Sequence, residues 1–596
     1  MGNGRRRIRL RQLAGAGLSA LAVLTSASPA ELVGSTAAVA HRADAAARTR
    51  DAPAPASRAL ILHEVWRVKL RDGPHGGVAL GSPSLATLGG APAAVFGDRS
   101  GRVYALNLGT GAPVPGWPKH VGAPVTSTPS AVMIPGSRDD EVLVGAGNAS
   151  EPCAGGYEWL RPTGAEGLLR APNPRADRAC GADGVLSGIA VGTLDGVTAA
   201  VAGTLGQETL AFDATTHQVL PGFPWFQADS NFATPAIADV EGNGANQIVE
   251  GGAQSAGLAF GRRYTQGGHI RVLSARGKLL CEDTTDESVN SSPAVGKFLA
   301  RGATGIVAGT GPTFPAASQN DEVIAVDAGC HEVWARKLAG TTGTESPALA
   351  DVLGNGQLQV LATTRTGGVY ALDGATGATV WHTRLKHDVY GSPVTVELGT
   401  GRQDVVVATI NGFDVLTGEH GQVLDATVVK TTGFQNAPLV TKDANGTIGV
   451  TLVGYQRSGS VAAHFEVVGS DDRNVDGPGT WPQFHHDSQL TGSAVTPIAA
   501  ASPAVSGISR FGARAPRSRR GAPPQPASLR PSSTTRQNGW PAGSACTMNL
   551  PPSSSTGPPS AVAPRATARA LAVPRSATVM SRWSCWGSPS GHRGAR

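Results

Sequence analysis

The feature that most constrains this chain is a repeating unit of about 45 residues, clearest from Ser346 to Trp381. Short apolar runs in this unit alternate with Gly- and Asn-containing turns, as antiparallel strands do. Four strands are expected within it or at its end: Pro347–Asp351, Leu358–Thr363, Val369–Asp373 and Ala378–Leu385. One sheet of four short strands cannot bury both of its faces, so copies of the unit must stack against it.

Copies of the unit are found along most of the chain. Seven steps of Ser, Thr or Ala followed by Pro open them, with prolines at 83, 129, 235, 293, 347, 393 and 438. The intervals between these prolines are 46, 106, 58, 54, 46 and 45 residues, so the long interval holds two units. The hidden unit starts near Ser187 and ends at Trp225. Eight units of four strands predict an all-β fold, an eight-bladed propeller of four-stranded antiparallel blades.

The N-terminal part of the repeat region predicts how the ring closes. His63–Leu70 (HEVWRVKL) nearly duplicates His331–Leu338 (HEVWARKL), the fourth strand of a central unit. A fourth strand that precedes the first complete unit is expected to pair with the last one, Ala437–Val468. Such pairing removes the two exposed sheet edges of an open ring.

Several motifs resemble known propeller repeats. They are GRVYALNLGTG (Gly101–Gly111), GGVYALDGATG (Gly367–Gly377), the strand-ending Trp334 and Trp381, DVxGNG at Asp239–Gly244 and Asp351–Gly356, and WPQFHHDSQLTG (Trp481–Gly492). The two GxVYAL motifs and the two tryptophans resemble the eight-bladed PQQ-like (quinoprotein dehydrogenase-like) propellers. This family includes outer-membrane assembly scaffolds as well as quinoproteins. The DVxGNG turns resemble FG-GAP repeats, and the last motif is similar to a phrase beside many exported bacterial propellers. The resemblance implies the fold from about Arg58 to Gly492 and leaves the function open.

The ends of the chain differ from its repeats. Residues 1–40 read as an export signal, with a basic start at Arg5–Arg11 and an apolar run at Leu13–Leu24. Sec export is favoured over twin-arginine export, and an uncleaved anchor is the alternative. A linker is expected at 41–57 and the propeller at 58–492. The Arg/Pro/Ser-rich tail, 493–596, is expected to be disordered. It is either a genuine basic tail or the product of a wrong reading frame in GC-rich DNA, as in a truncated pseudogene.

Charge is divided unevenly along the chain. Val495–Arg596 contributes +13 and Met1–Arg50 contributes +6, so the formal charge of +6 leaves −13 for residues 51–494. The propeller is therefore acidic, and nucleic acid is not an expected partner.

Cysteines and long loops suggest where this scaffold carries additions. Cys153 and Cys180 bracket a Gly/Pro/Arg-rich insertion, Asn148–Asp183, and are expected to form a disulfide; Cys281 and Cys330 are expected to form another. Two further insertions are Gln254–Gly267 and Gly311–Gln319. All three are expected between the second and third strands of their units, and therefore on one face. Binding loops are the functional interpretation, and neutral loop growth is the alternative.

The sequence offers one candidate metal site. Asp472, Asn474 and Asp476 match the start of a calcium-binding loop, D-x-N-x-D-G, but its twelfth position is Gln483 instead of Glu. A polar linker is the alternative for this segment, and plain turns are expected at Asp239 and Asp351. No cofactor other than calcium is suggested, because the Cys-Cys pair of quinoprotein dehydrogenases and the CxxCH of attached haem are both absent.

Together these observations predict an exported, non-catalytic propeller, secreted or at the cell surface, that acts as a binding or scaffolding module. The expected ligand is a protein, a glycan or a cell-envelope polymer. A monomer is expected, with no transmembrane segment after signal cleavage, and Trp66, Trp334 and Trp381 are expected to pack between blades. The alternative is an enzyme with its site in the central funnel, either a degenerate quinoprotein dehydrogenase or a polysaccharide-acting lyase or hydrolase. No catalytic residue can be named.

Overall fold

The structure is a computed structural model. It describes residues 60–494 apart from short gaps at 71–76, 79, 149–150, 163–165, 173–181, 228, 230, 254–266, 312–320, 340–344, 399–401, 430–431, 444, 457–458 and 469–480. The predicted signal, linker and tail lie outside the described residues, as do Cys180 and the candidate calcium ligands Asp472, Asn474 and Asp476.

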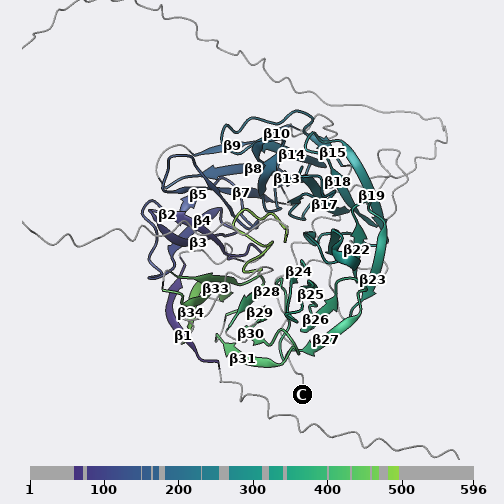
Figure 1. The fold of residues 1–596 in the computed structure, drawn as a ribbon. Coiled ribbons are helices and arrows are strands. Elements are labelled where there is room, and N and C mark those ends of the chain that lie inside the picture. Colours follow the sequence, from purple (N-terminus) through teal and green to yellow (C-terminus); the bar gives the residue numbers. More distant parts are fainter. Residues whose placement is uncertain are drawn as a thin grey trace, which may run out of the picture. The chain divides into compact units, whose positions relative to one another are not determined.

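The described residues form eight four-stranded antiparallel sheets, arranged as blades around a centre (Figure 1). From the innermost strand outward, blade one is β2 (Ser84–Leu88), β3 (Ala91–Gly97), β4 (Arg102–Asn107) and β5 (Lys119–His120); blade two is β6 (Ser130–Met133), β7 (Asp140–Asn148), β8 (Glu151–Leu160) and β9 (Gly167–Leu169); blade three is β12 (Ala190–Leu194), β13 (Val197–Gly203), β14 (Glu208–Asp213) and β15 (Trp225–Phe226); blade four is β16 (Ala236–Ala238), β17 (Gln247–Ala253), β18 (Gly268–Leu273) and β19 (Leu279–Thr285).

The remaining blades follow in chain order. Blade five is β20 (Ala294–Gly296), β21 (Gly305–Gly309), β22 (Glu322–Asp327) and β23 (Glu332–Lys337); blade six is β24 (Ala348–Ala350), β25 (Gln359–Thr363), β26 (Gly368–Asp373) and β27 (Thr379–Arg384); blade seven is β28 (Val394–Glu397), β29 (Gln403–Thr409), β30 (Gly412–Leu416) and β31 (Val423–Val428); blade eight is β32 (Leu439–Lys442), β33 (Ile448–Gln456), β34 (Gly459–Val467) and β1 (Leu62–Lys69). A two-stranded ribbon, β10 (Ala171–Pro172) and β11 (Ala182–Asp183), and a short 3-10 helix, Ala300–Gly302, lie outside the blades. Within the described residues, no helix has the length and apolar character needed to span a membrane.

The burial of each strand follows from its place in the blade. β25 is buried along its whole length because neighbouring blades cover both of its faces, and it therefore reads as a continuous run without polar alternation. The outer strand β27 is exposed except around Trp381. The four strands predicted between Pro347 and Leu385 are confirmed as β24–β27.

The predicted closure of the ring is confirmed. β1 pairs antiparallel with β34, with Leu62 opposite Val467 and Trp66 opposite His464. The sheet order β1-β34-β33-β32 shows that the first and last described strands share one blade. No blade of the ring is therefore left with an open seam, which is the physical advantage of closure.

Tryptophans on the outer strands of blades eight, five and six dock these blades onto the next blade in the ring. The indole Nε1 of Trp66 donates to the carbonyl oxygen of Leu108 at 2.7 Å, and Trp334 and Trp381 bond Gly374 and Gly418 in the same way. Each ring lies against a glycine with positive φ in that turn. These are Gly111, Gly377 and Gly421. The predicted packing role of the tryptophans is therefore confirmed, and the turn glycines are needed for it.

Gly377→Ala is expected to destabilise the propeller by about 2–4 kcal/mol. A Cβ at this position would lie 2.6 Å from the Trp334 ring, and the backbone has a φ of +68°, which side chains disfavour. Gly356→Ala in the same blade is the matched control, because its φ is +80° and no atom lies within 4 Å. Urea unfolding measures both variants, and an equal loss from the two substitutions would contradict the docking interpretation.

The seam also contains a buried histidine whose protonation opposes folding. His464 stacks on Trp66 at 5.5 Å between ring centroids, and burial lowers the pKa of His464 to about 4. The unfolded chain binds the proton near pH 6.5, so stability present above that pH is lost as the pH falls toward 4, by up to about 3 kcal/mol. His464→Gln should therefore lose less stability than the unsubstituted protein between pH 7.5 and 4.5, as measured by urea unfolding. Exposed His420→Gln is the control, and parallel pH profiles for the unsubstituted protein and His464→Gln would refute the assignment.

One sequence prediction is wrong in detail. Asn148–Asp183 is not a loop between the second and third strands of blade two, because β8 and β9 within it are the third and fourth strands. The Gly- and Pro-rich composition of this segment is typical of a loop and does not indicate β8 and β9. β8 is a strand because it pairs with β7, and β9 pairs in turn with β8. The extra length, including β10 and β11, follows the fourth strand. The other two insertions do connect second and third strands, β17 to β18 and β21 to β22.

All three insertions nevertheless leave from the same face of the ring. Because successive strands of a blade run in opposite directions, the connection from strand two to three and the connection from strand four to the next blade begin at the same face. We call this end of the ring the insertion face.

Candidate functional site

A row of hydroxyl groups joins the starts of the innermost strands. In six places the Ser or Thr that opens a blade accepts the backbone N–H of the equivalent residue in the preceding blade, at 2.9–3.0 Å. The donor–acceptor pairs are Ser82–Thr128, Gly188–Thr234, Thr234–Ser292, Ser292–Ser346, Ser346–Ser392 and Ala437–Ser82. From sequence these residues only marked the repeat. Their role in linking blades appears when the sheets are placed side by side.

The centre of the ring is occupied by the chain itself. Residues 481–494, which we call the plug, form the yellow-green trace at the centre of Figure 1. Backbone N–H groups of seven innermost strands donate to the plug at 2.7–3.2 Å. The donors and acceptors, in the order of the blades, are Thr395 to Trp481, Val440 to Pro482, Leu85 to the Gln483 side chain, Ala131 to Ser488, Val191 to Gln489, Ile237 to Thr491 and Val295 to Gly492.

These seven donors are equivalent positions. Each donor lies two residues after the proline of its blade's opening step, as Val295 follows Pro293. In blade three, Ile189 takes the place of that proline. Blade six is the blade that is not among these seven. It packs against the plug through apolar side chains, because Trp481 and Ala494, at the two ends of the plug, join the same apolar cluster as Leu349 of blade six. The plug thus contacts the whole inner circumference.

Asp487 organises the middle of the plug. Its carboxylate accepts the backbone N–H of Thr491 at 3.0 Å and the Thr491 hydroxyl at 2.6 Å, and His486 Nδ1 lies 3.1 Å away. These contacts hold the pKa of Asp487 below its usual range despite burial. Asp487 is therefore an ionised group that folds the plug into a turn.

His485 fixes this turn to the ring. Its Nδ1 lies 2.7 Å from the Leu490 carbonyl oxygen and its Nε2 lies 3.0 Å from that of Pro293. Only an imidazolium can donate to both, but burial outweighs the two carbonyls and lowers the pKa of His485 to about 4. At neutral pH the ring therefore donates through one nitrogen. The histidines of this motif have protein partners, and the described residues contain no cluster of three or more His, Cys, Asp or Glu side chains suited to a metal ion.

The DVxGNG turns are closed by their own backbone. Asp239 accepts the N–H groups of Asn243 and Gly244, and Asp351 accepts those of Asn355 and Gly356. Carboxylate oxygens that face N–H groups in this way are turn caps, as predicted. The calcium hypothesis for Asp472, Asn474 and Asp476 stays a prediction.

Carboxylates gather on the insertion face where two insertions leave. We call Asp286, Glu287, Asp321, Glu322 and Glu345 the acidic rim. Glu287 accepts the backbone N–H of Asp321 at 2.8 Å, and burial followed by repulsion from Glu287 raises the pKa of Asp321. Burial, with repulsion from Glu332 and Glu287, also raises the pKa of Glu322. Arg365 lies 3.3 Å from Glu345. Repulsion of this kind favours a cationic partner over an anionic one.

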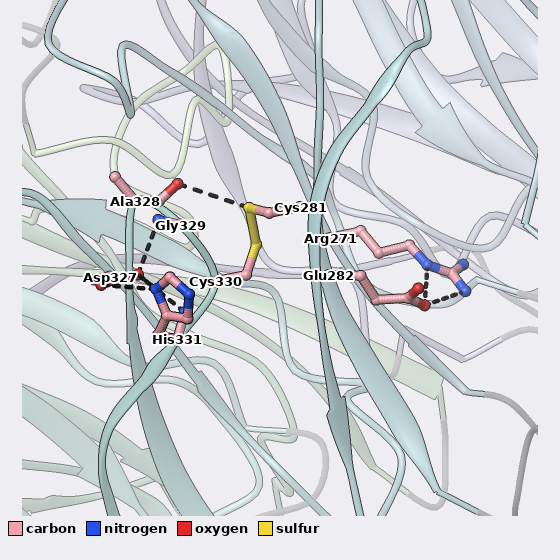
Figure 2. The surroundings of a disulfide bond; sticks show 8 residues. All are labelled: Arg271, Cys281, Glu282, Asp327, Ala328, Gly329, Cys330 and His331. Atoms are coloured by element: carbon pink, nitrogen blue, oxygen red, sulfur yellow. Dashed lines mark hydrogen bonds and ion pairs between the residues drawn. A yellow bond between two sulfur atoms is a disulfide. The ribbon is translucent and has the colours of Figure 1, made fainter.

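The predicted Cys281–Cys330 disulfide is confirmed and takes the place of one tryptophan contact (Figure 2). Cys281 pairs with Val272 beside a register shift, as Trp334 pairs with Ala325 and Trp381 with Ala371. Cys330 has positive φ in the turn of the next blade, and Cys281 Sγ lies 3.6 Å from the Ala328 carbonyl. A covalent bond thus joins blades four and five where tryptophan and glycine join others. The Cys153–Cys180 pair stays a prediction.

Cys281→Ser with Cys330→Ser is expected to lower the free energy of unfolding by about 2–4 kcal/mol, because the bond closes a 49-residue separation. Cys281→Trp with Cys330→Gly should recover part of this loss and make unfolding insensitive to reductant. Urea unfolding with and without dithiothreitol measures both variants. Equal stability of the serine variant and the unsubstituted protein would show that the disulfide between blades four and five does not stabilise the propeller.

Comparison with known proteins identifies the repeat. Residues 319–427 match the family described as outer membrane protein assembly factor BamB. This stretch consists of PQQ-like propeller repeats. It runs from β22 to β31, the outer half of blade five through blade seven, and the resemblance predicted from the sequence is confirmed there. No curated protein matches the chain in sequence.

Three solved structures resemble the chain at low sequence identity. BamB from Moraxella catarrhalis is 15% identical with a TM-score of 0.42, and covers 68% of this chain and 99% of its own. Saccharomyces cerevisiae Sqt1 is 11% identical with a TM-score of 0.48, covering 68% and 98%. A europium-containing methanol dehydrogenase is 10% identical with a TM-score of 0.48, covering 68% and 93%. Identities this low say nothing about function.

Proposed function

We propose that this protein is an exported, non-catalytic propeller that binds or scaffolds other proteins outside the cytoplasm through its insertion face. The observation that carries this proposal is the plug. In the alternative, a catalytic site would lie in the central funnel, but residues 481–494 accept hydrogen bonds there from the innermost strands of seven blades and share an apolar cluster with the remaining one, blade six. The surface that remains for a ligand is the outside of the ring.

Export is supported by two independent features. The first is the N-terminal pattern of an Arg-rich start followed by a short apolar run. The second is the Cys281–Cys330 disulfide, which persists in oxidising compartments. N-terminal sequencing of the protein from the culture medium and cell envelope tests this part, with cleavage after Ala30 or Ala40 expected.

A protein partner is supported by the family match, since that family is named for a factor in outer membrane protein assembly. The acidic rim and the charge of −13 between residues 51 and 494 favour a partner with a basic surface. A glycan or envelope polymer is the alternative ligand.

Site-specific photo-crosslinking in the native cells tests the binding face. A crosslinking amino acid replaces exposed Asp286 on the acidic rim or, as the matched control, exposed His420 in the turn between β30 and β31 on the opposite face. Discrete adducts with a basic protein are expected from position 286 and not from position 420. A crosslinker at exposed Thr366, also on the insertion face, should give the same adducts, and Asp286→Arg should abolish them. Adducts from both positions 286 and 420 or from neither would refute the proposal, as would alcohol oxidation by the purified protein supplied with quinone and calcium.

A further inference from the structure

We propose that the inner circumference of the ring is a peptide-binding site and that residues 481–494 are its ligand, held by contacts that do not depend on the covalent connection to β34. The site would accept this segment as a separate peptide. The site lines the channel of the ring, and the inference does not rest on the proposed function.

The hydrogen bonding has the form of peptide recognition. Innermost strands of a propeller leave backbone groups along the channel unpaired by sheet, and an extended peptide can satisfy them. Six plug carbonyls and the Gln483 side chain accept these N–H groups in succession around the ring. At Val295 the plug also donates back from Ala494, in a parallel bridge with β20. Backbone pairing of this kind gives affinity with little dependence on side chains.

Two buried side chains of the plug, Trp481 and Leu490, provide the specificity. Trp481 is 1% exposed and belongs to the apolar cluster of blades five to seven. Leu490 is fully buried beside blade three, where Gly188 stands in place of the usual Ser, Thr or Ala. A Cβ at Gly188 would lie 2.9 Å from Leu490, so the ring is shaped for that side chain.

The plug also has internal order that lowers the cost of binding. The hydrogen bonds that Thr491 donates to Asp487, and the contact between His485 and the Leu490 carbonyl oxygen, form within the segment itself. A peptide that is partly folded before it binds loses less conformational freedom on binding. These bonds span residues 485–491, which include three of the six accepting carbonyls, those of Ser488, Gln489 and Thr491.

Cleavage of the full chain tests the inference. A protease site placed within residues 469–480 is cut in the purified protein, which then passes through gel filtration. The C-terminal fragment is expected to stay with the propeller. In a control with the site after Ala494, the released tail should separate. Departure of the first fragment, or loss of the folded propeller on cutting, would overturn the proposal.

Exchange then tests specificity. A fluorescent synthetic peptide of residues 481–494 should replace the cut fragment when added in excess, and should not bind the uncut protein. The same peptide with Asp487→Ala or Leu490→Ala is expected to compete at least tenfold more weakly. Equal competition by the three peptides would show that the site does not read this segment and would overturn the proposal.

Discussion

A chain that ends at Thr480 is expected to lose about 5–10 kcal/mol of the free energy of unfolding relative to a chain that ends at Ala494. Removing the plug withdraws acceptors from seven backbone N–H groups, each worth roughly 0.5–1.5 kcal/mol. It also leaves the sites of Trp481 and Leu490 empty, and loss of such buried side chains costs about 2–5 kcal/mol each. Water that enters the channel restores part of the hydrogen bonding, so the expected loss is below the simple total.

Urea unfolding of the two chains, both starting at Ala59, measures this difference. A third chain that extends to Arg596 is the control. Its midpoint should equal that of the chain ending at Ala494, because an Arg/Pro/Ser-rich tail without apolar periodicity is not expected to bury a core. Added peptide 481–494 should restore the midpoint of the shortest chain. Equal midpoints for all three chains would show that the plug contributes nothing to the ring.

Removing β1 is expected to prevent formation of a soluble monomer. A chain that starts at Val78 lacks the strand that pairs with β34 and the Trp66 contact with blade one. Blade eight then exposes the edge of β34, a nine-residue strand whose apolar side chains are mostly buried in the ring. Such an edge favours association with other chains.

Light scattering and gel filtration compare this chain with one that starts at Ala59. Trp66→Ala in the longer chain separates the indole from the strand, with an expected loss of about 3–5 kcal/mol and a retained monomer. A monomeric, cooperatively unfolding protein without β1 would contradict the closure described above.

Repetition made the fold predictable from sequence. Each unit contains its own strand and turn pattern, so the eight-bladed ring can be derived locally, and the near-identity of His63–Leu70 with His331–Leu338 revealed the seam. The same comparison located the docking tryptophans. The prediction for blade two was wrong because β8 and β9 have the composition of a loop. They are strands through pairing, β8 with β7 and β9 with β8.

The central site could not be predicted in this way. WPQFHHDSQLTG was recognised as a phrase, but nothing local places it in the channel, since its partners lie on seven strands separated by up to 355 residues in the chain. The disulfide was expected from the cysteine positions, whereas its substitution for Trp and Gly required the strand register. A hydroxyl such as that of Ser346 shows its role only beside its neighbour, Ser292.

The amino-acid sequence by itself determined the repeat, the number of blades and the closing strand, because strand and turn formation depend on near neighbours and recur eight times. Tertiary structure alone decided that the centre is filled by the chain, that a disulfide replaces one indole contact, and that the acidic rim forms on the insertion face. Those features depend on the distance between residues far apart in the chain, which only closure of the ring sets.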